Sequence, residues 1–151
     1  MTRRVERSLL FAVLLAYVAL AALYAIRTPD WQAPDEPAHV NYIRQIAEDG
    51  GLPVLEPGDW QQEYQEELTA RGFDPALLGR LETVQYEDHQ PPLYYLLQAP
   101  VYAATGGDLL ALRLVSVTLG AGVVLAAWAV LRALFPERPA LALTGAAFVA
   151  F

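Results

Sequence analysis

Two short motifs carry most of the side chains that could do chemistry. The first is Pro34-Asp35-Glu36-Pro37-Ala38-His39, which follows a long apolar segment, and the second begins at His89. Two adjacent carboxylates can divide the roles of acid and base between them, and histidine is a common proton carrier near neutral pH. These residue types predict an acid–base site or a ligand-binding site that the two motifs form together.

Asp35 is the leading catalytic candidate, and Glu36 is the second. Asp35 also precedes a helix-like segment with proline in its first turn, so it is equally suited to be the helix N-cap, and the two roles do not exclude each other. His39 lies four residues after Asp35 and three after Glu36, so the three side chains can share one face of a helical turn. A Glu-x-x-His pair also occurs in carboxylate metal sites. A single copy is weak evidence for a structural metal site, and His39 is a candidate for substrate binding.

His89 precedes the double proline Pro91-Pro92. One interpretation is an exposed loop histidine beside acidic residues. The other is that the prolines stiffen the backbone and hold His89 over the site formed by Asp35. Tyr94 and Tyr95 follow closely and could stack on a sugar ring, although tyrosines at a membrane boundary more often serve as anchors. His89 and Tyr94 are therefore candidates for substrate binding.

Arg113 is a further substrate-binding candidate, because it lies about one turn inside an apolar segment. A charge within a membrane-spanning helix is a functional hypothesis by default. A lipid phosphate at that depth is a natural partner, since a guanidinium offers two parallel donors. Snorkelling of the side chain toward the headgroups is the alternative interpretation.

Three apolar segments predict an all-α, polytopic membrane fold. Leu9–Ile26 contains no charge and is long enough to cross most of a hydrocarbon layer of about 30 Å. A cleaved signal peptide is the alternative, but it would have a shorter apolar region and a small-residue cleavage site. The second span is predicted over 109–132, and a third begins over 140–151. Because a lipid-exposed helix should not end within the bilayer, we expect the N-terminal part of a longer membrane protein.

Arginines flank the predicted spans at ends that would share one side of the membrane: Arg3, Arg4, Arg7, Arg132 and Arg138. By the positive-inside rule this side is the cytoplasm, so the N-terminus is cytoplasmic and the loop over 27–107 lies outside the cell membrane. Up to His89, that loop holds four arginines against fourteen acidic residues, a balance of minus ten. Such an acidic surface excludes nucleic acid as a partner, because phosphate contacts need basic residues. The chain has no cysteine, which excludes disulfides and thiolate metal sites.

Two helices within this loop are predicted to lie at the membrane surface, over about 36–48 and 92–104. The first has an apolar side that includes Val40 and Ile43, which we expect to face the membrane. Between the two helices, residues 52–81 are acidic and turn-rich, contain one short helical segment and match no motif.

In this order the motifs resemble the N-terminal part of a GT-C superfamily glycosyltransferase. The similarity is to the family-39-like branch, which includes protein mannosyltransferases and the lipid A aminoarabinose transferase. It covers nearly the whole chain: a span, the Asp35-Glu36 motif, an interfacial helix, His89-Gln90-Pro91-Pro92-Leu93-Tyr94-Tyr95, and Ala111-Leu112-Arg113-Leu114 at the next span. The first motif is also similar to that of a related membrane family of unassigned function.

The resemblance implies a membrane lipid donor, a sugar on a polyprenyl phosphate, and an extracytoplasmic glycan, lipid or protein as acceptor. It implies that Asp35 is the general base, that Glu36 tunes or orients it, and that Arg113 holds the donor phosphate. Members of this superfamily differ in metal dependence, so a divalent metal is possible, with Glu36, His39 and His89 as candidate ligands and no metal ligand assigned. Family members have many more spans, so this chain is expected to be inactive by itself.

Two other functions are compatible with the sequence. One is a small membrane protein whose acidic loop binds a partner or cations, which predicts tolerance of substitutions at Asp35 and His89 and a natural end soon after Phe151. The other is a fragment of a transporter. It is less favoured, because the ionisable residues gather in the loop and not at mid-membrane.

Overall fold

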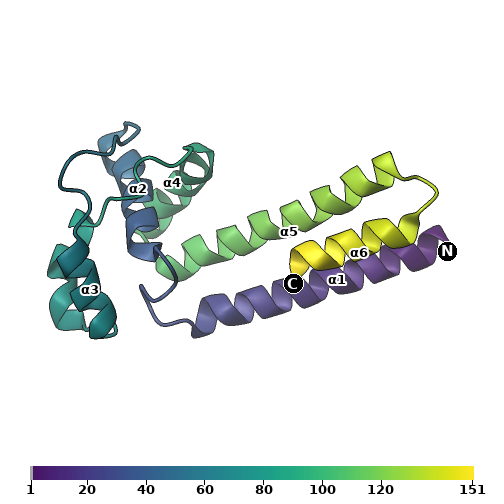
Figure 1. The fold of residues 1–151 in the computed structure, drawn as a ribbon, viewed down its shortest axis with the longest axis horizontal. Helices are drawn as coiled ribbons and strands as arrows, with labels where there is room; N and C mark the ends of the chain where they lie inside the picture. Colours follow the sequence, from purple (N-terminus) through teal and green to yellow (C-terminus); the bar gives the residue numbers. More distant parts are fainter. Residues whose placement is uncertain (1) are drawn as a thin grey trace. The chain divides into compact units, whose positions relative to one another are not determined.

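The computed structural model describes residues 2–151 and is all-α. Helices make up 72% of it, and no strand occurs in this range. The elements are, in chain order, α1 (Arg3–Arg27), α2 (Glu36–Asp49), α3 (Gln62–Ala70), the 3₁₀ helix η1 (Pro75–Thr83), α4 (Leu93–Thr105), α5 (Leu109–Leu134) and α6 (Pro139–Ala150) (Figure 1). They form two compact units: a loop unit, Thr28–Leu112, and a long-helix unit, Met1–Arg27 with Arg113–Phe151. The predicted all-α class is confirmed.

Two helices of the described chain, α1 and α5, are long and apolar enough to cross a membrane. Only 11% and 6% of their most apolar 18-residue windows are buried. A core helix of a soluble protein would bury most of such a window, whereas a lipid-facing helix exposes it to the bilayer. The two helices agree with the predicted membrane location. The number of spans and the direction of crossing stay predictions.

The long-helix unit has a small core to which α1, α5 and α6 each contribute. Leu10, Val124 and Ala146 are buried there, and α6 lies along α1 (Figure 1). At one point α5 meets the tip of a long side chain of α1, because a Cβ atom added at Gly120 would overlap the Tyr17 hydroxyl. The glycine thus leaves the space that the tyrosine occupies.

A buried acidic residue links α1 to α5 near the N-terminus of α1. Glu6 is 4% exposed, and its Oε1 accepts hydrogen bonds from Arg132 Nε at 2.7 Å and Trp128 Nε1 at 3.2 Å. Arg132 also donates to the carbonyl oxygen of Pro136. A charge buried beside apolar helices needs a partner. Arg132, which we named from the sequence only as an arginine that flanks a predicted span, therefore forms a specific ion pair.

Gly120→Ala is expected to weaken the packing of α1 on α5, because the added methyl group displaces the Tyr17 side chain. Gly122→Ala is the matched control, since a Cβ atom at Gly122 meets nothing within 4 Å. Alanine favours a helix over glycine by about 0.8–1.0 kcal/mol, so the control should be stabilised. Gly120→Ala should be less stable than the control by about 1–3 kcal/mol. Thermal unfolding in detergent micelles measures the difference, and equal Tm values would contradict the close contact.

The two longer helices of the loop unit begin and end where local sequence dictates. Pro37 lies in the first turn of α2, and Gly50 ends it with φ 74° and an N–H bond to the Ile46 carbonyl oxygen at 3.2 Å. Gly106, at φ 67°, ends α4 in the same way. Both helices lie within one or two residues of the ranges expected from the sequence.

The apolar side of α2 packs against α4. Val40 and Ile43 are buried in one core with Tyr95 and Ala99 of α4. Protein therefore covers the side that we expected to face the membrane, and that expectation is wrong. An amphipathic helix has the same pattern whether protein or lipid covers it, which is why the sequence could not distinguish the two. The outward side of α4 exposes apolar residues: Leu93, Leu96 and Leu97.

Residues 52–81, which match no motif, fold against another side of α2. They form α3 and η1, and with α2 and the following loop they make a second core: Ala38, Tyr64, Leu68, Leu81, Val84 and Tyr86. Asn41 of α2 is 6% exposed, and its Nδ2 donates to the carbonyl oxygens of Leu81 and Val84, both at 2.7 Å. Buried carbonyl groups need such donors. The N-terminal half of α2 is therefore held on two sides.

Candidate functional site

Asp35 occupies the N-cap position of α2 but does not cap the helix with its side chain. Its backbone is left-handed (φ 58°, ψ 8°), and its carboxylate makes no capping hydrogen bond. Instead Oδ1 accepts a 2.6 Å hydrogen bond from the Tyr86 hydroxyl. Aspartate enters the left-handed region more readily than most residues, although the conformation still costs free energy. The capping interpretation does not hold, and the carboxylate is available for another role.

Three side chains that can bind a proton or a cation converge at this point: Asp35, His39 and Glu87. One candidate ligand atom from each lies within 4.8 Å of the others. Asp35 is exposed, His39 is half-buried and Glu87 is 9% exposed. This three-residue group joins the start of α2 to the loop before α4, which lies far away in the sequence. The group is thus a product of the tertiary fold.

The other two members of the group are also oriented by neighbouring side chains. The Tyr95 hydroxyl and His39 Nδ1 share a 2.8 Å hydrogen bond, and Gln90 Nε2 donates to Glu87 Oε2 at 2.7 Å. In the tautomer with the proton on Nδ1, the His39 N–H donates this hydrogen bond to the Tyr95 oxygen. The other ring nitrogen, Nε2, then has a free lone pair that can accept a proton or bind a cation. Outer hydrogen bonds of this kind fix the direction of ligating or catalytic side chains.

The two orienting tyrosines are protonated at neutral pH, and burial moves the pKa of each further above it. It raises the pKa of Tyr86, and the hydrogen bond to Asp35 raises that pKa further. Burial likewise raises the pKa of Tyr95, with an added contribution from the negative charge of Glu87. The Tyr95 ring is held by stacking on Tyr42, with ring centroids 3.8 Å apart. Both hydroxyls therefore act at neutral pH as neutral hydrogen-bonding groups.

Further bonds fasten the loop over 87–90 to α2. Asp88 is 5% exposed, and Gln45 Nε2 donates to its two carboxylate oxygens at 3.1 and 2.9 Å. Burial raises the pKa of Asp88, and the bonds from Gln45 oppose that rise. The Tyr42 hydroxyl donates to the carbonyl oxygen of Gln90 at 3.1 Å. These contacts set the place from which Glu87 reaches the group.

Two residues expected at the site, His89 and Glu36, are not members of the three-residue group. His89 is exposed, and its Nδ1 donates to the carbonyl oxygen of Tyr86 at 3.0 Å. Glu36 is 8% exposed, at the start of α2. Of the candidate metal ligands named from the sequence, only His39 therefore belongs to the group.

Tyr94 and Arg113 make contacts of a structural kind. The Tyr94 hydroxyl accepts a hydrogen bond from Gln98 Nε2 at 3.1 Å, and its ring lies edge-on to Tyr95. Arg113 belongs to the long-helix unit, where it donates to the carbonyl oxygen of Ala25 at 3.0 Å. The last carbonyl groups of a helix have no partner within it, so this bond completes the end of α1. Substrate-binding roles for both residues stay predictions.

Sequence reasoning missed Tyr86 and Glu87. Both lie just before His89, so the segment that precedes the second motif reaches the site. A tyrosine followed by two acidic residues, in an otherwise turn-rich segment, was the available signal. It could not indicate which acid approaches Asp35, because that depends on how the loop packs against α2.

The group can accept a proton or hold a cation. An exposed, oriented carboxylate can act as a general base if a substrate proton comes within hydrogen-bonding distance. Imidazole nitrogen and carboxylate oxygen are also ligands for zinc and manganese. No protein-family model, no curated protein and no solved structure matches this chain. Its function has to be argued from this geometry and from the motifs.

Tyr86→Phe is expected to destabilise the loop unit, because Asp35 loses a charge-assisted hydrogen bond while the ring is kept. Hydrogen bonds to charged groups contribute about 1.5–3 kcal/mol, and the lower end applies here because Asp35 is exposed. Tyr102→Phe is the matched control, since that hydroxyl donates to Glu48 Oε1 at 3.3 Å in an exposed position. The control should change stability by less than about 0.5 kcal/mol. Thermal unfolding measures the stability of both variants. Equal losses of stability would contradict a stabilising role of the hydrogen bond from Tyr86 to Asp35.

Proposed function

We propose that this chain carries the catalytic carboxylate of a membrane glycosyltransferase. The reaction moves a sugar from a polyprenyl-phosphate donor to a glycan, lipid or protein acceptor outside the cytoplasm. One observation carries the proposal: Asp35 is exposed, oriented by Tyr86 and gathered with two other ionisable side chains in the loop unit. In the chain, that unit connects two helices long enough to span a membrane. The order of motifs similar to the family-39-like GT-C branch supports the same conclusion.

Asp35 is the general base of the proposed reaction. An acceptor hydroxyl attacks the anomeric carbon of the donor sugar, so a new carbon–oxygen bond forms as the bond to the phosphate oxygen breaks. Asp35 takes the hydroxyl proton, and the polyprenyl phosphate leaves with the bonding electrons. No strong general acid is required, because phosphate is a good leaving group. A positioned base contributes about 10²–10⁴-fold to the rate.

The contacts of Asp35 suit this role. Tyr86 binds Oδ1 and so restricts the rotation of the carboxylate, while the exposure of Asp35 gives an acceptor access to it. A base that is already oriented does not need to be ordered during the reaction, which lowers the entropic part of the barrier. We assign Glu36, buried next to it in the chain, to orienting Asp35 and not to proton transfer.

The lipid part of the donor places the proposed reaction at the membrane surface. A polyprenyl tail dissolves in the hydrocarbon layer while its phosphate stays among the headgroups. The exposed apolar side chains of α4 suit an element at that boundary. Arg113 is the proposed partner of the donor phosphate, and His89 and Tyr94 are the proposed contacts of the sugar. The N-terminus then lies in the cytoplasm.

Asp35→Asn is expected to lower sugar transfer at least about 100-fold, because the amide keeps the shape but cannot take the proton. Transfer is measured in membranes from cells that express the whole enzyme, with a labelled polyprenyl-phosphate sugar as donor. Asp30→Asn is the matched control, since Asp30 is an exposed acid shortly before the motif. It should leave the rate unchanged at equal expression. Full activity of Asp35→Asn would remove Asp35 as the base.

Cation binding is a second candidate function, and the three-residue group favours it specifically. Ligand bonds of about 2.0–2.2 Å place the ligand atoms of a tetrahedral site about 3.3–3.6 Å apart. The ligand atoms of the group lie within 4.8 Å of one another, so binding would need the side chains to close by about 1 Å. Three protein ligands also leave a coordination position for water or substrate. When bound, a divalent cation would supply positive charge for the departing phosphate. Without transfer activity, the chain would be a cation-binding membrane protein.

Mn²⁺ and Zn²⁺ are the probes for this site, titrated by calorimetry into purified protein that has been treated with a chelator. His39→Ala and Glu87→Gln should each weaken binding at least about tenfold, because each removes one ligand. His89→Ala is the matched control, because His89 is exposed and outside the group. It should bind as the parent protein does. Unchanged binding by His39→Ala would rule out this site.

A further inference from the structure

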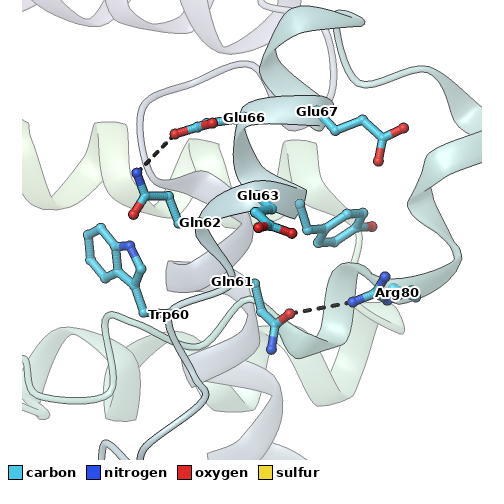
Figure 2. A pocket seen from close by; sticks show the side chains of 8 residues that line it. Trp60, Gln61, Gln62, Glu63, Glu66, Glu67 and Arg80 are labelled. Carbon is cyan, nitrogen blue, oxygen red and sulfur yellow. Dashed lines mark hydrogen bonds between the residues drawn. The ribbon is translucent and has the colours of Figure 1, made fainter.

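A polar cavity of about 620 Å³ lies in the part of the loop unit that matches no motif. It is lined by residues of α3, of η1 and of the segment just before α3: Trp60, Gln61, Gln62, Glu63, Tyr64, Glu66, Glu67 and Arg80 (Figure 2). Ligand-binding pockets typically measure about 300–1,000 Å³, so this cavity could hold one or two sugar-sized rings.

Two hydrogen bonds and one cation–ring contact join side chains of the lining, most of which are exposed. Gln62 Nε2 donates to Glu66 Oε1 at 2.9 Å, and Arg80 donates to Gln61 Oε1 at 3.4 Å, as Figure 2 shows by dashed lines. The Arg80 guanidinium lies 4.9 Å from the centre of the buried Tyr64 ring. Amide, carboxylate and guanidinium groups are therefore held around one space, offering both donors and acceptors.

Trp60 adds a large aromatic surface that is 61% exposed. Its ring contacts the Tyr86 ring, with centroids 4.8 Å apart and planes at 57°, so its position is set by packing. Tyr86 in turn donates to Asp35. One tyrosine thus contacts both the aromatic side of the cavity and the proposed catalytic base.

The lining narrows the class of ligand. Three glutamates, Glu63, Glu66 and Glu67, outnumber Arg80, so anionic ligands such as phosphates and acidic sugars are disfavoured. The mainly polar lining disfavours a lipid tail or an apolar peptide. A neutral or amino-substituted sugar is neither anionic nor apolar, so it fits this lining. Its hydroxyl groups can pair with amides and carboxylates, and its C–H face can cover an aromatic ring.

We infer that this cavity is a subsite for the acceptor, and that it binds a neutral or amino-substituted glycan. Asp35 does not line the cavity, but Tyr86 connects the two, because it contacts Trp60 and donates to Asp35; the sugar bound here would be a neighbour of the unit whose hydroxyl reacts. The assignment to the acceptor, and not to the donor sugar, rests on the proposed function. The binding of a sugar in the cavity does not.

Sugar binding is tested directly on the purified chain in detergent micelles, by saturation-transfer NMR and by tryptophan fluorescence. Glucose and glucosamine are expected to bind, and glucuronate at least about tenfold more weakly because of the glutamates. Trp60→Ala should weaken glucose binding at least about tenfold, which corresponds to about 1.4 kcal/mol. Trp60→Phe should bind glucose nearly as well as the parent protein, because phenylalanine keeps an aromatic face. The absence of binding by both glucose and glucosamine would overturn the inference.

A charge variant tests the cavity without altering the aromatic contact. Glu63→Gln should weaken glucosamine binding several-fold, because it removes one acidic group from the lining. Glu82→Gln is its matched control, since Glu82 is exposed and does not line the cavity. Circular dichroism confirms that each variant folds. Equal binding by Trp60→Ala, Glu63→Gln and the parent protein would place the sugar elsewhere and overturn the inference.

The transfer assay separates this inference from the proposed function. Trp60→Ala should raise the KM for the acceptor and leave the KM for the donor unchanged. A raised KM for the donor with an unchanged KM for the acceptor would show that the cavity binds the donor sugar, and would overturn the assignment to the acceptor. Asp35→Asn should lose transfer but still bind glucose. If Asp35→Asn keeps transfer while glucose still binds in the cavity, the proposed function fails and the sugar subsite stands. If Asp35→Asn loses transfer and no sugar binds, the subsite fails alone.

Discussion

The packing of α2 on two sides is the constraint on which the candidate site depends. One side of the helix meets α4 through Val40 and Ile43, and another meets η1 and the loop after it through the buried amide of Asn41. A helix fixed in this way cannot rotate without opening a core, and close-packed cores resist such changes. His39, in the first turn, is therefore presented in one direction. The precision that binding or catalysis needs thus comes from burial elsewhere in the unit.

Tyr86 connects that scaffold to the polar site. It is buried with residues of α2, α3 and η1, and its ring lies against Trp60. Its hydroxyl emerges from this apolar setting to orient Asp35. A tyrosine is suited to such a position because one end is apolar and the other forms hydrogen bonds. Burial raises its pKa, so the hydroxyl stays protonated and does not place a second negative charge beside the carboxylate.

The features that could be predicted from the sequence are those that depend on local chemistry. Long, mainly apolar segments mark α1 and α5, and Gly50 and Gly106 end α2 and α4 because they adopt left-handed conformations. The spacing of one helical turn predicted that Asp35 and His39 lie close together, and both belong to the three-residue group. Glu87 was not predicted, because its approach to Asp35 depends on how a loop far away in the sequence packs against α2. The membrane-facing side expected for α2 was wrong for a related reason: the pattern shows that Val40 and Ile43 are covered, but not by what.

The conformation of Asp35 has a physical cost that its contacts help to offset. A side-chain cap would stabilise α2 by about 1 kcal/mol, and a left-handed backbone costs a further amount of about 1–3 kcal/mol. Against this stand the short bond from Tyr86, of the charge-assisted class that contributes about 1.5–3 kcal/mol, and the favourable position of the Glu36 charge in the first turn of the helix. A carboxylate that capped α2 would face the backbone N–H groups of its own helix. Turned toward Tyr86, it joins His39 and Glu87 and remains exposed, which is the arrangement that a base or a ligand requires.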